Sequence, residues 1–320
     1  MRILLTGSSG WLARFLVPRL ESLGHEVTGF DIAPGPHTQI IASVSERAAV
    51  DRAFDVHGIE AVIHAGALHK PDVIRFPAQS FVDVNVTGTL NLLSAAVRAG
   101  HDRFVLTSTT SLMISDATRR DLGHSAVWID ESLGPLEPRN IYGATKLAAE
   151  NFCRIHHLEH GLNCVVLRTA RFFPEEDDTN DDLSGENLKA NEFLHRRLTA
   201  RDAADIHAAA LQQAPNVGFD ILIASAPTPF VRSEAVELKR DAAALIVSKF
   251  PKVEELYANR GWRLPTTIGR VYDASRAERI LGYRCQTDFS AILDALENGR
   301  PLPFEHDDGY VSPSTSSWTP

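Results

Sequence analysis

The chain has 320 residues, 44% hydrophobic and 23% charged, which is typical of globular proteins and excludes disorder, collagen and coiled coil as the main architecture. Its 32 basic and 41 acidic residues give a net charge of −9, so we expect no nucleic-acid partner. No apolar run approaches about 18 residues, so we expect no membrane span. The apolar start is interrupted at residues 6–10, which argues against a signal peptide. The three cysteines, Cys153, Cys164 and Cys285, lack metal spacing and indicate a reducing cytoplasm.

Short apolar runs that suit buried strands alternate with segments of helical periodicity, and several of those segments end at a glycine, a common helix C-cap. We expect strands at residues 2–5, 26–31, 61–64, 104–107 and 164–168, and helices at 11–23, 48–57, 86–98 and 142–160. This alternation predicts an α/β fold with a doubly wound parallel sheet covered by helices on both faces.

The second half of the chain has weaker periodicity. We expect a helix over residues 189–213, at least in the later part of that range, a second helix over 234–249, and a strand over 218–224 that rejoins the sheet. Residues 175–182 hold six acids in eight positions, which suits a bound cation or, more commonly, a solvated loop. The tail over residues 301–320 is rich in Pro, Ser, Thr and Asp.

The segment TGSSGWLA, residues 6–13, lies between the first strand and the first helix. Gly7 and Gly10 allow a sharp turn and a close approach of the backbone to a pyrophosphate, which the helix N-terminus then binds. Asp31 ends the second strand, where an acid can bind the adenosine ribose hydroxyls and repel a 2′-phosphate. No basic residue follows in residues 32–36, so the pattern favours NAD over NADP. The alternative is a pair of turn glycines in an α/β protein that binds no nucleotide.

Tyr142 and Lys146 lie four residues apart and therefore share a helix face. A phenol with a pKa near 10 is a poor base at neutral pH, but a nearby ammonium and a nicotinamide charge would lower that pKa. Tyr142 is thus a candidate to take a proton from a substrate hydroxyl. Upstream, the hydroxyl cluster at residues 107–111 follows a strand and is a candidate to hold the substrate oxygen.

Together these segments resemble the extended short-chain dehydrogenase/reductase family, in its NAD-dependent epimerase/dehydratase branch. The segments that carry the resemblance are TGSSGWLA (6–13), FD (30–31), HAGA (64–67), NVTGTLNLL (85–93), FVLTSTTS (104–111), YGATK (142–146), VVLRTARFFP (165–174), RDAADIHAAAL (201–211) and DASRAERILGY (273–283). The resemblance implies a Rossmann domain over residues 1–170, a smaller α/β substrate region over 171–300, and a tail over 301–320.

Site roles follow from the same resemblance. It implies that Thr109, Tyr142 and Lys146 are catalytic, that Lys146 also binds the nicotinamide ribose, and that Asn85 supports the active-site helix. Helices 86–98 and 142–160 would pack into a four-helix interface of a homodimer. The expected contacts with NAD are Gly7, Ser9, Gly10, Trp11, Leu12, Asp31, His64, Ala65, Gly66, Tyr142 and Lys146.

Three departures from the family pattern bear on the adenine contact, the reaction and the substrate. Ser43 and Val44 stand where the family often has an Asp-hydrophobic pair against adenine, which leaves that contact open. Thr109 is followed by Thr110 and Ser111 rather than by the Asp-Glu pair of sugar-nucleotide 4,6-dehydratases, which disfavours dehydration. Arg171 replaces the Asn of sugar-nucleotide epimerases, and residues 168–178 have some likeness to a segment of uronate dehydrogenases.

Arginine side chains offer bidentate donors for a diphosphate or a carboxylate. A surface ion pair with an acidic residue is an equally good interpretation of each candidate arginine. We expect no metal site, because the histidines at 156, 157 and 160 have no third ligand nearby. The expected substrate contacts are Ser108, Thr110, Arg171, Arg197 and Arg270.

Three functions stay open. The first is an NAD-dependent sugar epimerase, acting on a nucleotide-linked sugar through transient oxidation of a hydroxyl to a ketone. The second is a dehydrogenase of a sugar, sugar acid or other small alcohol that releases NADH. The third is a non-catalytic NAD-sensing protein, against which the complete set of Thr109, Tyr142 and Lys146 argues.

Overall fold

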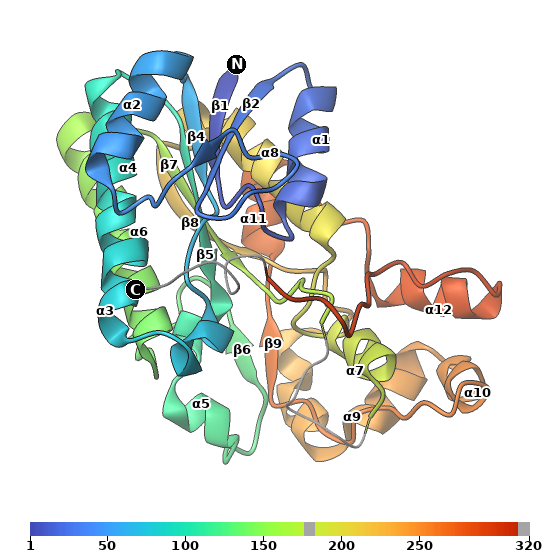
Figure 1. The fold of residues 1–320 in the computed structure, drawn as a ribbon. Helices are drawn as coiled ribbons and strands as arrows, with labels where there is room; N and C mark the ends of the chain where they lie inside the picture. Colours follow the sequence, from blue (N-terminus) through green and yellow to red (C-terminus); the bar gives the residue numbers. More distant parts are fainter. Residues whose placement is uncertain (176–182, 313–320) are drawn as a thin grey trace.

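The computed structural model describes residues 1–175 and 183–312. Its main sheet has seven parallel strands in the order β3-β2-β1-β4-β5-β7-β8 (Figure 1). The order reverses between β1 and β4, so the expected doubly wound α/β fold is confirmed. The strands are β1 Arg2–Thr6, β2 Glu26–Asp31, β3 Ile40–Ile41, β4 Ala61–His64, β5 Phe104–Thr109, β7 Cys164–Thr169 and β8 Phe219–Ala224.

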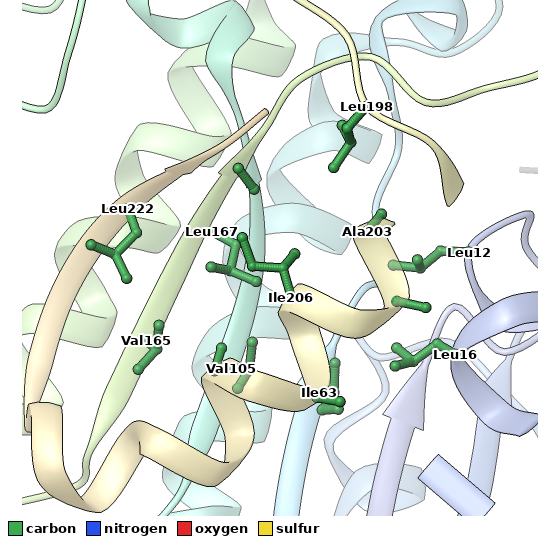
Figure 2. Packing of buried hydrophobic residues seen from close by; sticks show 14 of the residues in the cluster. Leu12, Leu16, Ile63, Val105, Val165, Leu167, Leu198, Ala203, Ile206 and Leu222 are labelled. Carbon is green, nitrogen blue, oxygen red and sulfur yellow. The ribbon is translucent and has the colours of Figure 1, made fainter. Parts of the chain in front are cut away.

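Helices cover both faces of this sheet. Leu16 of α1 and Ile206 of α8 pack with Val105 and Val165 on one face (Figure 2), and on the other face Leu92 of α4 packs with Phe104. The helices on the first face are α1 Ala13–Ser22, α8 Ala200–Val217 and α11 Ser275–Leu281; those on the second face are α2 Arg47–His57, α4 Gly88–Arg98 and α6 Ile141–His160.

A smaller α/β part has its own hydrophobic core, which includes Phe193, Tyr257, Trp262 and Phe289. It contains a parallel two-stranded sheet, β6 Val127–Ile129 with β9 Arg270–Tyr272. Its other elements are α7 Gly185–Glu192, η4 Arg232–Glu234, α9 Ala235–Lys249, α10 Val253–Ala258 and α12 Phe289–Glu297, with α5 Asp116–Arg120 nearby in Figure 1. None of the described helices is long and apolar enough to cross a membrane.

The helix predicted at least in the later part of residues 189–213 is present there as α8, whereas the first part of the range is interrupted. The chain leaves α7 at Glu192 and starts α8 at Ala200. Arg197 instead forms a parallel bridge with Arg171, and the Thr199 hydroxyl accepts the Asp202 N–H at 2.9 Å. A side-chain cap of this kind starts a new helix, so the helical spacing does not run through it.

The predicted helix over residues 86–98 extends upstream through an irregular turn. The chain forms α3 Ala78–Phe81, then the π-helical turn η2 Val82–Thr87, and only then α4. Such π-turns are frequent at functional sites. The short 3₁₀ turns η1 Lys70–Ile74 and η3 Thr110–Met113 follow β4 and β5 at the same edge of the sheet.

Candidate active site

A cavity lies at the carboxyl edge of β1, β2 and β4. Gly7 has φ +76°, and a Cβ there would lie 2.8 Å from the Gly66 amide nitrogen, so only glycine fits this turn. The Gly10 N–H donates to the Gly7 carbonyl at 3.0 Å and closes the turn ahead of α1. The cavity lining consists of Gly7, Ser9, Gly10, Phe30, Asp31, Ile32, Ala42, Ser43, Val44, Ala65, Gly66, Ala67, Leu68, His69, Phe76, Val84 and Ser312.

Asp31 is the acid of this cavity. Its carboxylate accepts the Ser9 N–H at 3.1 Å and the Ala33 N–H at 2.9 Å, so it fixes the glycine loop against the end of β2. Burial raises the pKa of Asp31, while these backbone donors work against that rise. A half-buried carboxylate beside the glycine turn and the start of α1 is the donor and acceptor set that the adenosine ribose and pyrophosphate of NAD require.

The structure places some expected cofactor residues differently. Six of them line the cavity, but Trp11, Leu12, His64, Tyr142 and Lys146 do not. Leu12 packs in the core toward α8 (Figure 2). Ser43 and Val44, which the sequence left open, do line the cavity.

His64 lies beneath the cavity, since its ring is fully buried between β1 and α4. Its Nδ1 lies 2.7 Å from the Thr6 hydroxyl and its Nε2 lies 3.0 Å from the Thr89 hydroxyl. Burial, assisted by the charge of Lys146, lowers the pKa of His64 to about 3, so the ring is neutral. His64 therefore positions the neighbouring backbone through Thr6, and its contact with the cofactor stays a prediction.

Tyr142 and Thr109 meet at the end of β5. Asn140 caps α6 by accepting the Gly143 N–H at 2.9 Å, which sets Tyr142 in the first turn. Burial raises the pKa of Tyr142 to about 12, although a hydrogen bond with the Thr109 side chain works against this rise. The expected lowering is thus outweighed by burial, which removes water from a phenolate. The ring of His69 stands edge-on to Tyr142, with 6.3 Å between centroids.

Lys146 lies one turn further along α6 and is buried. Burial lowers its pKa to about 8, although the nearby Glu150 carboxylate favours the charged form. Arg168 donates to both oxygens of Glu150, at 3.0 and 2.7 Å. The Ser108 hydroxyl donates to the same carboxylate at 2.6 Å. Ser108 therefore belongs to a buried ionic cluster under α6, and its contact with substrate stays a prediction.

Asn85, in the π-turn η2, connects the two halves of this region. Its side chain pairs with the Leu68 backbone, accepting the N–H at 2.9 Å and donating to the carbonyl at 3.1 Å. It also donates to the Thr145 hydroxyl on α6 at 3.2 Å. The chain that follows β4 is thus held in register with the helix that carries Tyr142.

The side chains of two further predicted substrate residues form hydrogen bonds within the fold. The Thr110 hydroxyl donates to the Thr169 carbonyl at 3.2 Å, and this side chain is buried. Arg197 is buried as well, donating to Glu192 at 2.8 Å and to the Phe173 carbonyl at 2.6 Å. A guanidinium can be buried only when it is paired in this way. The fold thus uses both side chains, and their contact with substrate stays a prediction.

Arg171 and Arg270 keep access to open space. Arg171 lies 3.8 Å from the Glu175 carboxylate and is 30% exposed. Arg270 lines a second cavity of about 500 Å³ between α7, α5 and the chain before β9. Three further arginines line that cavity, namely Arg119, Arg196 and Arg263, together with two acids, Asp121 and Glu192.

Several site residues carry little sequence signal. His69, Phe76 and Leu68 come from the irregular chain after β4 and line the first cavity. The acidic segment at 175–182 lies largely outside the described residues. Within the described ranges, no group of three or more His, Cys, Asp or Glu side chains has the arrangement of a metal site.

Known proteins with this pattern share the fold and part of the sequence. The chain is 32% identical to the 3-beta-hydroxysteroid dehydrogenase of Mycolicibacterium neoaurum over 188 residues, covering 56% of this chain and 49% of that protein. It is 29% identical to the UDP-glucose 4-epimerase of Rhizobium meliloti (strain 1021) over 175 residues, covering 52% of this chain and 50% of that protein. The chain thus spans about half the length of these curated relatives.

A solved structure gives the same fold. It is a short-chain dehydrogenase/reductase superfamily protein from Agrobacterium tumefaciens with bound NAD, with a TM-score of 0.66 and 23% identity, covering 93% of this chain and 96% of that one. The model of the NAD dependent epimerase/dehydratase family matches residues 3–187. With this match over more than half of its length, the chain belongs to the NAD dependent epimerase/dehydratase family.

Proposed function

We propose that this protein is an NAD-dependent enzyme that oxidises a hydroxyl of a sugar substrate at Tyr142. The observation that carries the proposal is the position of Tyr142 beside Thr109 and one helical turn before the buried Lys146, next to a cavity with a glycine turn and Asp31. Gly7, Ser9, Gly10, Asp31, Ala65 and Gly66 would hold NAD⁺, which supplies the hydride acceptor there. Residues 171–300 would supply most of the substrate contacts.

The roles of the catalytic side chains follow from their chemistry. The Thr109 hydroxyl holds the substrate oxygen, and the Tyr142 oxygen takes its proton as the carbon is oxidised to a ketone. Because burial raises the pKa of Tyr142 to about 12, positive charge close to the phenol is needed to make it a base at neutral pH. The Lys146 ammonium, one helical turn away, supplies such charge and would also bind the ribose hydroxyls of the cofactor.

The second cavity supports a nucleotide-linked sugar. Its volume of about 500 Å³ exceeds what a monosaccharide fills and lies within the roughly 300–1,000 Å³ of ligand sites. Its two acids are paired, Asp121 with Lys239 and Glu192 with Arg196. Of the four arginines, Arg196 is thus paired with Glu192, and Arg119 and Arg270 offer guanidinium donors that suit a diphosphate. With such an anchor the ketone is retained, turned and reduced on its other face, and we propose an epimerase.

Arg171 favours a second candidate, a dehydrogenase of a sugar acid. It follows β7 two residues after Thr169, and Thr169 pairs with Thr109 across the sheet. A partly exposed guanidinium near the catalytic hydroxyls suits the carboxylate of a small substrate. In that case the ketone or lactone product leaves and NADH accumulates.

One experiment separates these candidates. Proton NMR is recorded on the full chain with NAD⁺ and a panel of nucleotide sugars, free sugars and sugar acids. A new sugar isomer without NADH supports the epimerase, whereas one NADH per substrate consumed supports the dehydrogenase and refutes the epimerase. Tyr142→Phe should abolish either turnover, while Tyr272→Phe, a matched change at a buried tyrosine of β9, should not. Unchanged turnover in Tyr142→Phe would refute the catalytic assignment.

We also propose a homodimer in the cytoplasm. The helices α4 and α6 pack against each other, as two helices of the expected four-helix interface would, and Leu158 on α6 is 68% exposed. The three cysteines are free, which suits a reducing compartment. Light scattering should give twice the mass of the chain, and Leu158→Glu should reduce that mass to one chain; a monomeric wild type would refute the dimer.

A further inference from the structure

His69 lies beside Tyr142 but is not one of the three expected catalytic residues. It belongs to the chain after β4 and lines the same cavity as Gly7 and Asp31. Its ring stands edge-on to Tyr142, with 6.3 Å between centroids, and packs on the Phe173 ring with 5.5 Å between centroids. A polar ring thus borders both the cofactor cavity and the side chain that we propose as the base.

The backbone at His69 is held on both sides. The His69 N–H donates to the Asp72 carboxylate at 2.7 Å, and the Asp72 N–H donates to the His69 carbonyl at 3.0 Å. One residue earlier, the Asn85 side chain pairs with the N–H and the carbonyl of Leu68. The ring of His69 therefore starts from a fixed backbone position, as a preorganised binding residue requires.

The Phe173 ring, which supports His69, is held in place as well. The buried Arg197 guanidinium donates to the Phe173 carbonyl at 2.6 Å, and Arg197 is itself paired with Glu192 of α7. The Phe172 ring stacks on Phe173 with 4.8 Å between centroids. The position of the His69 ring thus depends both on the chain after β4 and on the part of the molecule that contains α7.

The outer ring nitrogen of His69 is not used by the fold. His64 and His207 each use both ring nitrogens for hydrogen bonds with their neighbours. For Nε2 of His69, by contrast, no residue in the described part of the chain is a hydrogen-bond partner. A ring that is held firmly beside a cavity and keeps a nitrogen unused is suited to bind a ligand.

The charge of the ring indicates which ligand group it suits. Burial lowers the pKa of His69; the Asp72 carboxylate opposes this shift and the Lys146 ammonium adds to it. The ring is therefore uncharged at neutral pH, with one nitrogen that donates and one that accepts. A hydroxyl does both and pairs with either tautomer, whereas a carboxylate only accepts and is bound better by a cation.

We propose that His69 binds a second hydroxyl of the sugar, on a carbon next to the one that is oxidised, and so determines which sugars are accepted. Because the rings of His69 and Tyr142 are neighbours, a sugar whose reacting hydroxyl lies at Tyr142 presents an adjacent hydroxyl toward His69. A pocket that hydrogen-bonds a substrate hydroxyl rejects analogues without it, since its own polar group is then left unpaired. This inference rests on the proposed function.

The first test compares the sugar of the NMR panel that has the highest turnover with its monodeoxy analogues. His69→Phe keeps a ring against Phe173 and removes both nitrogens, so kcat/KM for the parent sugar should fall about tenfold, the effect of one hydrogen bond. For one analogue, which already lacks the partner hydroxyl, the variant and the wild type should have equal kcat/KM. An equal fall for every analogue would indicate a structural role and overturn the proposal, as would an unchanged value for the parent sugar.

His57→Phe is the matched control. His57 lies in the last turn of α2, which runs from the carboxyl edge of the sheet back to the start of β4, so this residue is remote from the site. The substitution makes the same chemical change and should leave kcat/KM unchanged for the parent sugar and for each analogue.

The second test does not depend on a variant of His69. Tyr142→Phe with isotope-labelled histidine is mixed with NAD⁺ and the same sugars, and the ring nitrogens are followed by NMR. The Nε2 resonance of His69 should shift with the parent sugar and stay in place with one monodeoxy analogue; no shift with the parent sugar overturns the proposal. If the wild type turns over no sugar of the panel, the proposed function itself fails, and this outcome is distinct from turnover that is insensitive to His69.

Discussion

Replacing Lys146 with methionine should abolish turnover and yet stabilise the fold. Lys146 is 2% exposed, and its nearest acid, Glu150, is already bound by Arg168 and Ser108. The ammonium therefore loses its hydration without gaining a carboxylate of its own. A methionine has a similar length and no charge to bury, so Lys146→Met removes a cost that the folded state carries.

The size of this cost follows from the pKa. Burial lowers the pKa of Lys146 from 10.5 to about 8, and each unit corresponds to about 1.36 kcal/mol, which gives about 3 kcal/mol. Because the folded-state pKa lies below the unfolded one, the cost is complete below the folded pKa. Above that pH the unfolded chain binds more protons than the folded one, so the cost shrinks as pH rises and vanishes above the unfolded pKa.

Urea unfolding followed by circular dichroism measures this difference. At pH 7, Lys146→Met should be more stable than the wild type by about 3 kcal/mol, and at about pH 9.5 the gap should shrink to about 1 kcal/mol. Lys70→Met, at an exposed lysine, should change neither value. A variant that is less stable than the wild type at pH 7, or a gap independent of pH, would refute this account of the buried ammonium.

Three further substitutions test other parts of the site. Asp31→Ser removes the acid expected to bind the ribose hydroxyls. Because one charged hydrogen bond of about 1.5–3 kcal/mol is lost, kcat/KM for NAD⁺ should fall roughly tenfold or more and NADP⁺ should be favoured. An unchanged preference between the two cofactors would contradict this role. Asn85→Ala breaks the link to Thr145 and should lower kcat, with about 1–3 kcal/mol lost in urea unfolding; normal kcat would show that the link is dispensable. Glu150→Gln leaves Arg168 buried without its partner and should cost about 3–5 kcal/mol, and equal urea midpoints would rule out an intact buried pair.

The alternation of strands and helices was predictable because its signals are local. Gly58 and Gly161 both take left-handed conformations directly after helices, as glycine C-caps do. The glycine turn before α1 and the four-residue spacing of Tyr142 and Lys146 are equally local, since helix geometry alone places the latter two on one face. The fold class needed no information about tertiary contacts.

Side-chain direction within a buried strand was not predictable. In β5 the Thr107 hydroxyl pairs with His207 of α8 at 2.8 Å, while Ser108 pairs with Glu150 of α6 on the opposite face. Period-two alternation separates these neighbours, but a strand covered on both faces gives no polar face to mark which side holds the substrate. The same ambiguity applies to His64, which sequence alone shows only as the end of an apolar strand.

The positions at which helices start or break could not be predicted from the sequence, for a different reason. The start of α8 at Ala200 depends on the Thr199 cap and on the bridge between Arg171 and Arg197, which lie 26 positions apart in sequence. The π-turn at η2 accompanies contacts of Asn85 with chain segments 17 and 60 residues away. A contact between residues so far apart in sequence overrides the local hydrophobic periodicity, and that periodicity gives no sign of the contact.

The charges buried under α6 explain why the chain accepts such a cost. Burial raises the pKa of Tyr142 to about 12 and lowers that of Lys146 to about 8, so both shifts disfavour the ionised form that base catalysis uses. Glu150 opposes the second shift, and Arg168 and Ser108 keep Glu150 in place to do so. A site that ionises its phenol only when further positive charge is near spends little time as an active base without cofactor. The ionic cluster is thus best understood as a support that keeps Lys146 charged in a dry site.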